Sequence, residues 1–329
     1  MPATRRTDAV LLVVAVVWGS SYLTAKAATD ATPVLIVLFL RAFLSALASV
    51  VAVVAAARGS GLFTRDEIGR GALLGLTQAA VLALETYGVT QTSAANAGLI
   101  ISLTLVLTPL LDRVGRRGGV AGRFFLAAGL CVGGVCLLMS GQGLRVPGTG
   151  DLLMLAAAVV RAGHVVLVGR IATGPTLRPL HLTAVQSVVG AVVFLPPAAG
   201  GLPVLARADA MTWAQLFYLA LFCGLFAFLA QTWAVQRTSA TRASLLLGTE
   251  PVWALLVGIG FGGEHLTALS ALGAALIVTG TYWGQSIERA HRGRGASGPA
   301  ARVAPAPVVA VGPEATGFPV PRQRPGPGT

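Results

Sequence analysis

Charged residues are scarce in this sequence. Asp, Glu, Lys and Arg make up 11% of the 329 residues, whereas apolar residues make up 55%. A soluble domain carries about 25% charged residues. So low a charged fraction leaves too little polar surface to face water. This excludes most soluble folds and makes a lipid bilayer the expected solvent of the chain.

Cysteine and aromatic residues are also few. The three cysteines all lie in apolar runs, so we expect neither a disulfide framework nor a Cys/His metal site, and no cofactor. The net charge of +12 would suit a nucleic-acid binder, but such proteins interleave basic residues with aromatic ones, which are only 6% here. We therefore expect no nucleic-acid partner.

Long apolar runs, by contrast, are abundant. A membrane helix needs about 20 apolar residues and satisfies its own backbone hydrogen bonds in lipid. By this criterion the chain is predicted to be an all-α integral membrane protein with ten transmembrane helices. The predicted spans are 9–28, 33–56, 71–89, 93–111, 124–140, 152–171, 180–199, 212–235, 239–260 and 266–283. The first run follows two arginines as a signal peptide would, but nine similar runs come after it, so we interpret it as a span.

The basic residues predict how these spans are oriented. With the N-terminus inside, 19 of the 24 Lys and Arg residues fall in inside loops or in the C-terminal tail. The outside segments hold Lys26, Arg145 and Arg207, while Arg41 and Arg161 lie within spans. Cytoplasmic loops are enriched in Lys and Arg. The sequence therefore predicts a multi-pass protein of the inner (plasma) membrane with both termini in the cytoplasm.

The two halves of the chain resemble each other. The first span opens with Asp8-Ala-Val-Leu-Leu and the sixth with Asp151-Leu-Leu-Met-Leu. Further along, ETYGVTQTSA from Glu85 matches QTWAVQRTSA from Gln231. Each half has five spans, an odd number, so the second half enters the membrane from the opposite side. This predicts two inverted five-helix repeats, 8–140 and 151–284, followed by a disordered cytoplasmic tail over 288–329 that is rich in Arg, Pro, Gly and Ala.

Several short motifs occur in a fixed order along the spans. They are Trp18-Gly-Ser-Ser-Tyr, Leu40-Arg41, Thr238-Ser-Ala-Thr-Arg-Ala-Ser-Leu-Leu-Leu-Gly-Thr-Glu-Pro-Val, Gly263-Glu264 and the Gly273 to Gly280 run. In this order they resemble the EamA-type permeases of the drug/metabolite transporter superfamily, from residue 8 to about residue 284. The resemblance implies a ten-span inner-membrane carrier with a central cavity between its halves. Many such carriers export amino acids, metabolites or toxic compounds.

Charged and polar residues inside the spans are the candidate functional groups. A charge at mid-membrane costs at least about 2.5–3.5 kcal/mol, so it must face protein, water or a partner. The predicted substrate-binding residues are Trp18, Tyr22, Gln78, Glu85, Arg161, His164, Gln231 and Glu250. Glu85 and His164 are the candidates for proton coupling. The alternative is that these charges form ion pairs that fix helix packing, and for Arg41 we favour that structural interpretation.

Prolines and glycines within the spans predict irregular or close-packed helices. Pro109 and Pro251 each remove a backbone donor, and broken helices often line transporter sites. Small residues allow helices to approach closely. The spacings of Gly129 and Gly133, and of Gly273 and Gly280, therefore predict close packing in the fifth and tenth spans.

Three functions are compatible with this pattern, and none is enzymatic. No nucleophile–base pair, metal-ligand cluster or phosphate loop stands on an external segment, so we expect no catalytic residue. The first hypothesis is a secondary transporter that exports a small amphipathic or zwitterionic metabolite, amino-acid-like or drug-like, by alternating access. The second is an importer or exchanger of phosphorylated sugars or nucleotide sugars. Such a protein would need more Arg and Lys within its spans than Arg41 and Arg161 provide. The third is a non-transporting membrane scaffold or sensor. For the first hypothesis the expected partners are a small-molecule substrate, protons as the candidate coupling ion and the lipid bilayer, with the protein a monomer or homodimer.

Overall fold

Helices account for every regular element in the part of the chain that the computed structural model describes. The described residues are 2–56, 62–113, 122–139, 148–172, 177–237, 243, 246–263 and 267–296. The helices of the first half are α1 (Pro2–Ala31), α2 (Val34–Ala56), α3 (Arg65–Val89), α4 (Ala94–Ile101), α5 (Thr104–Arg113) and α6 (Gly122–Met139). Those of the second half are α7 (Thr149–Ile171), α8 (Pro179–Ala198), η1 (Ala199–Arg207), α9 (Ala210–Phe217), η2 (Tyr218–Phe226), α10 (Ala227–Arg237), α12 (Glu250–Gly260) and α13 (Ala268–Ala296). Residues 1–290 form one compact unit and residues 291–329 a second, and the packing described below is that of the first unit.

Most of the helices are long and apolar enough to cross a membrane. By length and composition seven helical segments meet this criterion, and three shorter apolar helices accompany them within the described residues. The seven are Arg6–Ala31, Val34–Ala56, Arg65–Val89, Ala94–Asp112, Thr149–Ile171, Pro179–Arg207 and Ala210–Arg237, and the three are Phe125–Gly134, Glu250–Gly260 and Ala271–Gly284. Each predicted span overlaps one of these segments, while the number ten stays a prediction.

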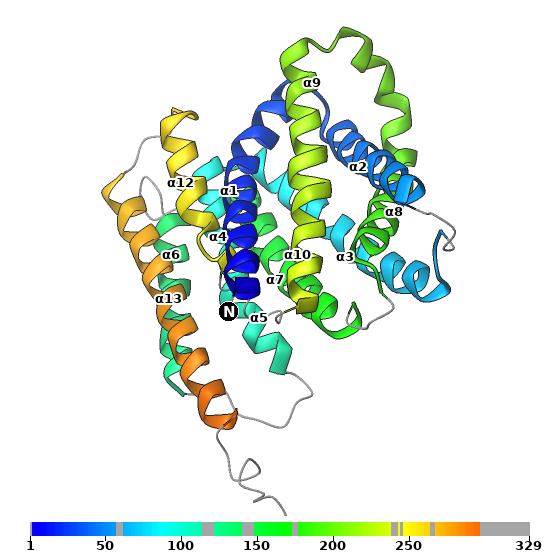
Figure 1. Ribbon diagram of the computed structural model, residues 1–329. Helices are drawn as coiled ribbons and strands as arrows, with labels where there is room; N and C mark the ends of the chain where they lie inside the picture. The colour runs from blue at the N-terminus through cyan, green and yellow to red at the C-terminus, as the bar shows by residue number, and fades with distance from the viewer. Residues whose placement is uncertain are drawn as a thin grey trace, which may run out of the picture. The chain divides into compact units, whose positions relative to one another are not determined.

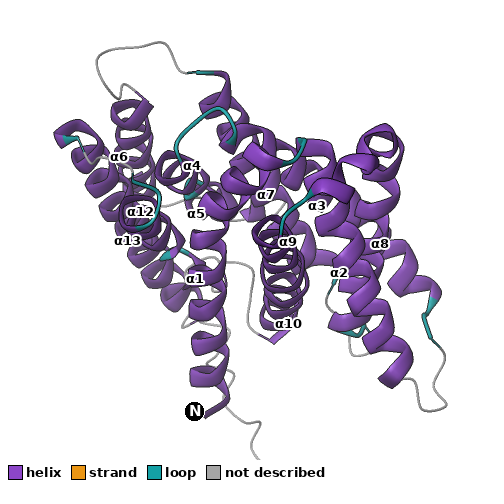
Figure 2. Cartoon of the chain, turned by 90° about the horizontal axis from the view of Figure 1, so that it is seen from above, coloured by secondary structure: helices purple, strands orange, loops and turns teal. Residues whose placement is uncertain are grey.

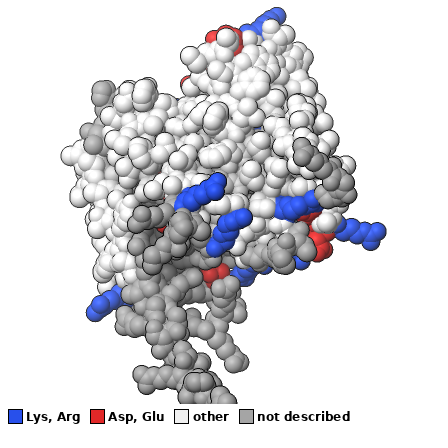
Figure 3. All heavy atoms as spheres, viewed as in Figure 1, with Lys and Arg blue, Asp and Glu red and all other residues white. Residues whose placement is uncertain are grey.

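The outer surface of the helices is largely apolar. In Figure 3 the charged side chains of one face gather toward its top and its lower part, and a broad band of uncharged residues lies between them. Large apolar side chains are exposed on many helices, such as Leu47 on α2 and Val192 on α8. Exposed apolar surface of this extent is expected where a chain meets lipid tails.

Two of the predicted spans are broken helices. Span 93–111 consists of α4 and α5, which are separated by a turn at Ser102 and Leu103. In the span that ends with α12, a turn at Gly248 and Thr249 precedes the helix. When the Thr-Ser-Ala string of the first half is aligned with that of the second, position 102 corresponds to position 248. The two breaks therefore lie at equivalent points of the two halves.

The predicted span 212–235 is also irregular. A nine-residue π-helix, η2, joins α9 to α10. Two of its carbonyl groups accept hydrogen bonds from other helices, because Trp18 Nε1 donates to Cys223 O at 3.0 Å and Ser45 Oγ donates to Ala220 O at 2.6 Å. π-Helical turns are rare and occur mostly at functional sites. This one adjoins the candidate site described below.

Helices from the two halves of the chain pack against one another. α2 packs along α8, and α3 packs against both α7 and α8. α1 lies between α12 on one side and η2 and α10 on the other (Figures 1 and 2). α4 packs against α7 and α12. The centre of this unit is thus formed jointly by helices of both halves.

α6 and α13 approach each other closely, although not through all of the predicted glycines. A Cβ atom on Gly134 would lie 2.7 Å from Gly273 O, and one on Gly280 would lie 2.8 Å from Cys131 Sγ. A Cβ atom on Gly129 or Gly133 would have no neighbouring atom within 4 Å. The contact therefore runs along the face of α6 that carries Cys131 and Gly134.

The predicted tail begins as a helix. α13 continues to Ala296, so residues 288–296 are helical, whereas the sequence predicted disorder from residue 288 onward. Glu, Arg and Ala predominate in this segment up to Arg292, and extending an existing helix with such residues costs far less than starting a new one. Residues 297–329 of the predicted tail lie outside the described residues.

The closest approach of α1 to α12 gives a first test of the fold. A Cβ atom on Gly19 would lie 2.6 Å from Trp253 Cβ and 2.9 Å from the backbone of Glu250. Overpacking of this kind costs about 1–3 kcal/mol. We expect Gly19→Ala to lower the unfolding temperature of the purified protein. Gly163→Ala is the matched control, because a Cβ atom on Gly163 meets no atom within 4 Å. Equal unfolding temperatures for the two variants would contradict this packing.

Candidate functional site

A buried arginine on α7 is the centre of the candidate site. Arg161 Nη2 lies 2.8 Å from Glu250 Oε2, and its Nη1 lies 3.1 Å from Glu250 Oε1, so two parallel hydrogen bonds join the pair. Nη1 also lies 3.3 Å from Glu85 Oε1. Parallel charge-assisted bonds are the strong form of this interaction. Arg161 is therefore bound firmly to Glu250 and less closely to Glu85.

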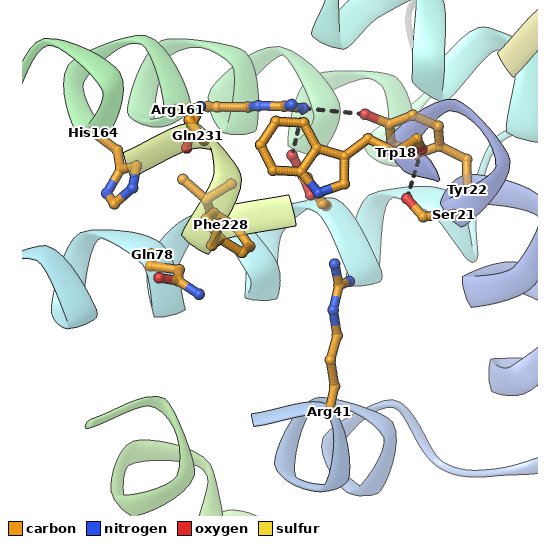
Figure 4. Close-up of a pocket in the computed structure, with 11 residues that line it drawn as sticks. Trp18, Ser21, Tyr22, Arg41, Gln78, Arg161, His164, Phe228 and Gln231 are labelled. Atoms are coloured by element: carbon orange, nitrogen blue, oxygen red, sulfur yellow. Dashed lines mark hydrogen bonds and ion pairs between the residues drawn. The ribbon is translucent and has the colours of Figure 1, made fainter. Parts of the chain in front are cut away.

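Two aromatic residues of α1 complete this cluster. Tyr22 donates a hydrogen bond from its hydroxyl to Glu250 and accepts one from Arg161 Nη1 at 3.2 Å. The Arg161 guanidinium carbon lies 4.5 Å from the ring centre of Trp18, a cation–π contact (Figure 4). Trp18 and Tyr22 are one helical turn apart, which places both on one face of α1. They therefore join the first half of the chain to the ion pair of the second.

The position of Glu250 follows from the break that precedes α12. Glu250 is the first residue of this helix and Pro251 the second. A helix N-terminus carries a partial positive charge and favours a carboxylate. Proline suits this first turn because the backbone donor it lacks would have no partner there. The Glu-Pro pair is thus what allows a charged carboxylate to begin a helix in the interior.

The predicted site residues line two cavities that share Arg161 and Gln231. The lining residues of the first cavity are Trp18, Ser21, Tyr22, Arg41, Gln78, Val81, Glu85, Arg161, His164, Phe228 and Gln231. The lining residues of the second cavity are Ile101, Ser102, Thr104, Arg161, Val165, Gln231, Leu247, Glu250 and Pro251. Residues next to both helix breaks face the second cavity. All eight predicted substrate-binding residues, and Arg41, therefore come together in space.

Several buried polar atoms of the first cavity have no hydrogen-bond partner among the described residues. They include Gln78 Oε1, Gln231 Oε1 and His164 Nε2. The other ring nitrogen of His164, Nδ1, lies 2.8 Å from Thr77 Oγ1. Buried polar groups are normally paired with protein or water. These atoms are therefore available to a small polar molecule.

Sequence reasoning missed some of the lining residues. Ser21, Val81 and Phe228 line the first cavity although none of them is charged. Phe228 is the one with a signal, because it precedes Gln231 by nearly one turn and so shares its helix face. Arg161, Gln231 and Glu250 of the second cavity were predicted. Ser102, Thr104 and Leu247 were missed, because the position of the helix breaks, and not the residue type, brings them there.

A second buried carboxylate has a structural role. Glu67, near the start of α3, accepts hydrogen bonds from Arg178 Nε at 2.8 Å and from Arg178 Nη2 at 2.9 Å. It also accepts one from the backbone of Thr64 at 2.9 Å. The hydrogen bonds that Arg178 donates to Glu67 raise the pKa of Arg178 above its ordinary value. Because both oxygens of Glu67 are occupied, this pair ties α3 to the start of α8 and is not a candidate site.

Comparison with known proteins identifies the family. The model of the EamA-like transporter family matches residues 5–140 and again residues 148–283. The chain belongs to this family. One similar protein, an "Uncharacterized transporter" of Archaeoglobus fulgidus, is 26% identical over 82% of this chain and 83% of its own length. The "Uncharacterized inner membrane transporter YedA" of Escherichia coli K12 is 27% identical over 82% of this chain and 87% of its own.

The fold is shared with a protein of known structure. A crystal structure covering 87% of this EamA-like chain, and 99% of its own, superposes with a TM-score of 0.62 at 18% identity. The chain is thus a multi-pass membrane transporter made of two EamA repeats, as the resemblance of its motifs predicted. At this identity the structure supports the fold alone.

Proposed function

We propose that this EamA-like protein is a secondary transporter that exports a small amphipathic or zwitterionic metabolite by alternating access. The observation that carries the proposal is the joint origin of the ion-pair cluster. Tyr22 and Glu85 come from the first repeat, and Arg161 and Glu250 come from the second. A cluster that joins two repeats across a cavity must rearrange when the repeats move relative to each other. It is therefore suited to couple that movement to the access of substrate to the cavity.

Inversion of the two repeats is supported by the symmetry of their contacts. α1 packs against α12, and with the repeats exchanged this contact becomes that of α7 with α4 and α5. Likewise, the contact of α2 with η2 corresponds to that of α8 with α3, and α3 with α7 corresponds to α10 with α1. The contact of α2 with α8 maps onto itself, as does the contact of the span that contains α4 with the span that contains α12. A two-fold relation between repeats of five spans each requires opposite orientation in the membrane, and such repeats exchange conformations in secondary transporters.

The matched helix breaks support the location of the substrate site. Ser102 and Thr104 from one break, and Leu247 and Glu250 from the other, line the same cavity beside Arg161. Discontinuous helices at corresponding positions of two repeats frequently form transporter binding sites, because they free backbone groups and helix ends for ligands. The equivalent breaks therefore support a central site between the repeats.

The character of the lining favours an amphipathic substrate of low net charge. The rings of Trp18 and Phe228 lie 5.3 Å apart and provide an apolar wall. The described lining of the two cavities includes two cations, Arg41 and Arg161, and the charge of Arg161 is already compensated by carboxylates. A phosphorylated sugar or nucleotide sugar carries two or more negative charges and would need more cationic side chains than this. The composition of the lining thus favours the first hypothesis over the second.

The proposed setting is the inner membrane of the cell, with both termini in the cytoplasm. The distribution of Lys and Arg supports this orientation. The Escherichia coli relative is named as an inner membrane transporter. Export from the cytoplasm through the site, with protons as the coupling ion, is consistent with the carboxylate at its edge.

An export assay in cells tests this function. We expect overexpression of the wild-type protein to raise the tolerated concentration of at least one amino acid, amino-acid analogue or amphipathic drug, and to lower its content in the cytoplasm. The matched control is the Arg161→Gln variant at equal abundance in the membrane. Overexpression that raises the internal content of phosphorylated sugars, or that alters no compound in a broad panel, would contradict the proposal.

A further inference from the structure

Arg41 differs from every other arginine in the described interior. It lies on α2, its side chain lines the first cavity, and 5% of its surface is exposed. Its Nε is buried and has no hydrogen-bond partner in the part of the chain that the structure describes. Figure 4 shows the guanidinium extending from α2 into the cavity toward Trp18 and Ser21, without a dashed line to any residue. Within the described residues, Arg41 therefore has neither the ion pair nor the hydrogen bonds expected of a structural arginine.

Arg161 shows what a structurally compensated arginine looks like in the same cavity. It has two carboxylates, one hydroxyl and one aromatic ring as partners. A buried cation is costly unless it is paired and hydrogen-bonded. Arg41 is equally buried but bears this cost without such partners. The buried charge of Arg41 is explained if its partner is a molecule that enters the cavity.

We infer that Arg41 binds the anionic group of the transported molecule, so that the substrate carries a carboxylate or an equivalent monoanion. The inference rests on the proposed function, because it assumes that the cavity is the transport site. A guanidinium presents two parallel N–H groups to a carboxylate and is the preferred residue for this contact.

The rest of the cavity fits the other end of a zwitterion. Gln78 Oε1 and Gln231 Oε1 are buried acceptors that have no partner among the described residues, and Glu85 lies 3.3 Å from Arg161. These are the oxygens that an ammonium group requires. Trp18 and Phe228 supply the apolar wall for a side chain between the two ends. The lining therefore offers, in kind, the contacts that an α-amino acid or a compound of similar charge requires.

The competing explanation is that Arg41 balances charge from a distance. Arg41 and Arg161 together carry as much positive charge as Glu85 and Glu250 carry negative charge. If Arg41 served only this balance, its neutralisation would destabilise the empty protein. If the partner of Arg41 is a substrate anion, replacing Arg41 by a neutral residue removes an unpaired buried charge. The variant without substrate is then at least as stable as the wild type without substrate. The sign of the change in stability therefore separates the two explanations.

The experiment is thermal unfolding of the full-length protein purified in detergent, with pairs of acids and their amides as probes. The pairs are leucine and leucinamide, phenylalanine and phenylalaninamide, threonine and threoninamide, and benzoate and benzamide. We expect at least one acid to raise the unfolding temperature of the wild type, with its amide at least about tenfold weaker, because the amide leaves the guanidinium unpaired. Arg41→Gln should lose the response to the acid, and Arg41→Lys should keep part of it. Arg207→Gln, which removes an exposed arginine of η1, should respond as the wild type does.

Each other outcome has a definite meaning. Amides that stabilise the wild type as well as the acids do, or an Arg41→Gln variant that keeps the response to the acid, would overturn the role of Arg41 and leave the proposed transport function intact. An empty Arg41→Gln protein that unfolds well below the wild type, while Arg41→Lys does not, would favour distant charge balance instead. If no acid and no amide stabilises the wild type, the proposed substrate class fails, and this inference fails with it. The comparison of acid with amide needs no variant, so it holds even where a substitution prevents folding.

Discussion

Replacing Arg161 by glutamine is expected to abolish transport and to lower the unfolding temperature sharply. The guanidinium is the common partner of Glu250, at 2.8 Å, and Glu85, at 3.3 Å. Removing one partner of a buried ion pair leaves an uncompensated charge and costs about 3–5 kcal/mol. Because two carboxylates lose their partner at once, we expect a loss of stability at the upper end of this range.

A double variant separates the loss of stability from the loss of transport. In Arg161→Gln/Glu250→Gln the closest ion pair is replaced by two amides that can hydrogen-bond to each other, so much of the unfolding temperature should return. Transport should not return, because the cation that joins α7 to Tyr22, Glu85 and Trp18 is still missing. The measurements are thermal unfolding in detergent and export in cells at matched abundance. Full transport by the double variant would show that this cluster only stabilises the fold.

The positions of most helices along the chain were predictable because they depend on the average properties of long segments. A run of about 20 apolar residues has few alternatives to a helix in lipid. The breaks were less predictable. Pro251 predicted a break near Gly248, because a proline removes the hydrogen bond to the carbonyl four residues before it, whereas Ser102 has no proline beside it and Pro109 lies within α5. The π-helix η2 likewise has no sequence signal that we recognise, and hydrogen bonds from Trp18 and Ser45 on other helices accompany it.

The composition of the site was predictable for a different reason. A charged residue in an apolar span must find a polar environment, so Glu85, Arg161 and Glu250 were expected to converge. Which charges pair could not be predicted, because that depends on distances of a few ångströms between helices that are distant in sequence. Arg41 illustrates this limit. The sequence favoured a structural ion pair for it, whereas the structure gives it no ion pair within the described residues and directs it into the cavity.

Substituting glutamine for Glu85 is expected to uncouple transport from the proton gradient. Arg161 gives two parallel bonds to Glu250 and a single longer contact to Glu85, so Glu85 is the carboxylate with free lone pairs. A free carboxylate oxygen in a cavity of low polarity takes either a proton or the ammonium group of a substrate, and has room for one of them at a time. Exchange of the two at Glu85 would couple proton entry to substrate export. The neutral amide of Glu85→Gln takes up no proton and forms no ion pair with a substrate ammonium group.

The measurement is export from proteoliposomes, with and without an inwardly directed proton gradient, of whichever compound the cellular assay yields. The wild type should be accelerated by the gradient, and Glu85→Gln should move the compound at one slow rate in both conditions. Asp66→Asn is the matched control, because it neutralises a carboxylate on the same helix whose side chain is 70% exposed and which pairs with Arg70 outside the cavity. A Glu85→Gln protein that keeps the full response to the gradient would exclude Glu85 as the coupling group. His164 would then be the remaining predicted candidate for proton coupling, because its buried Nε2, which has no partner among the described residues, can bind a proton but not a substrate ammonium.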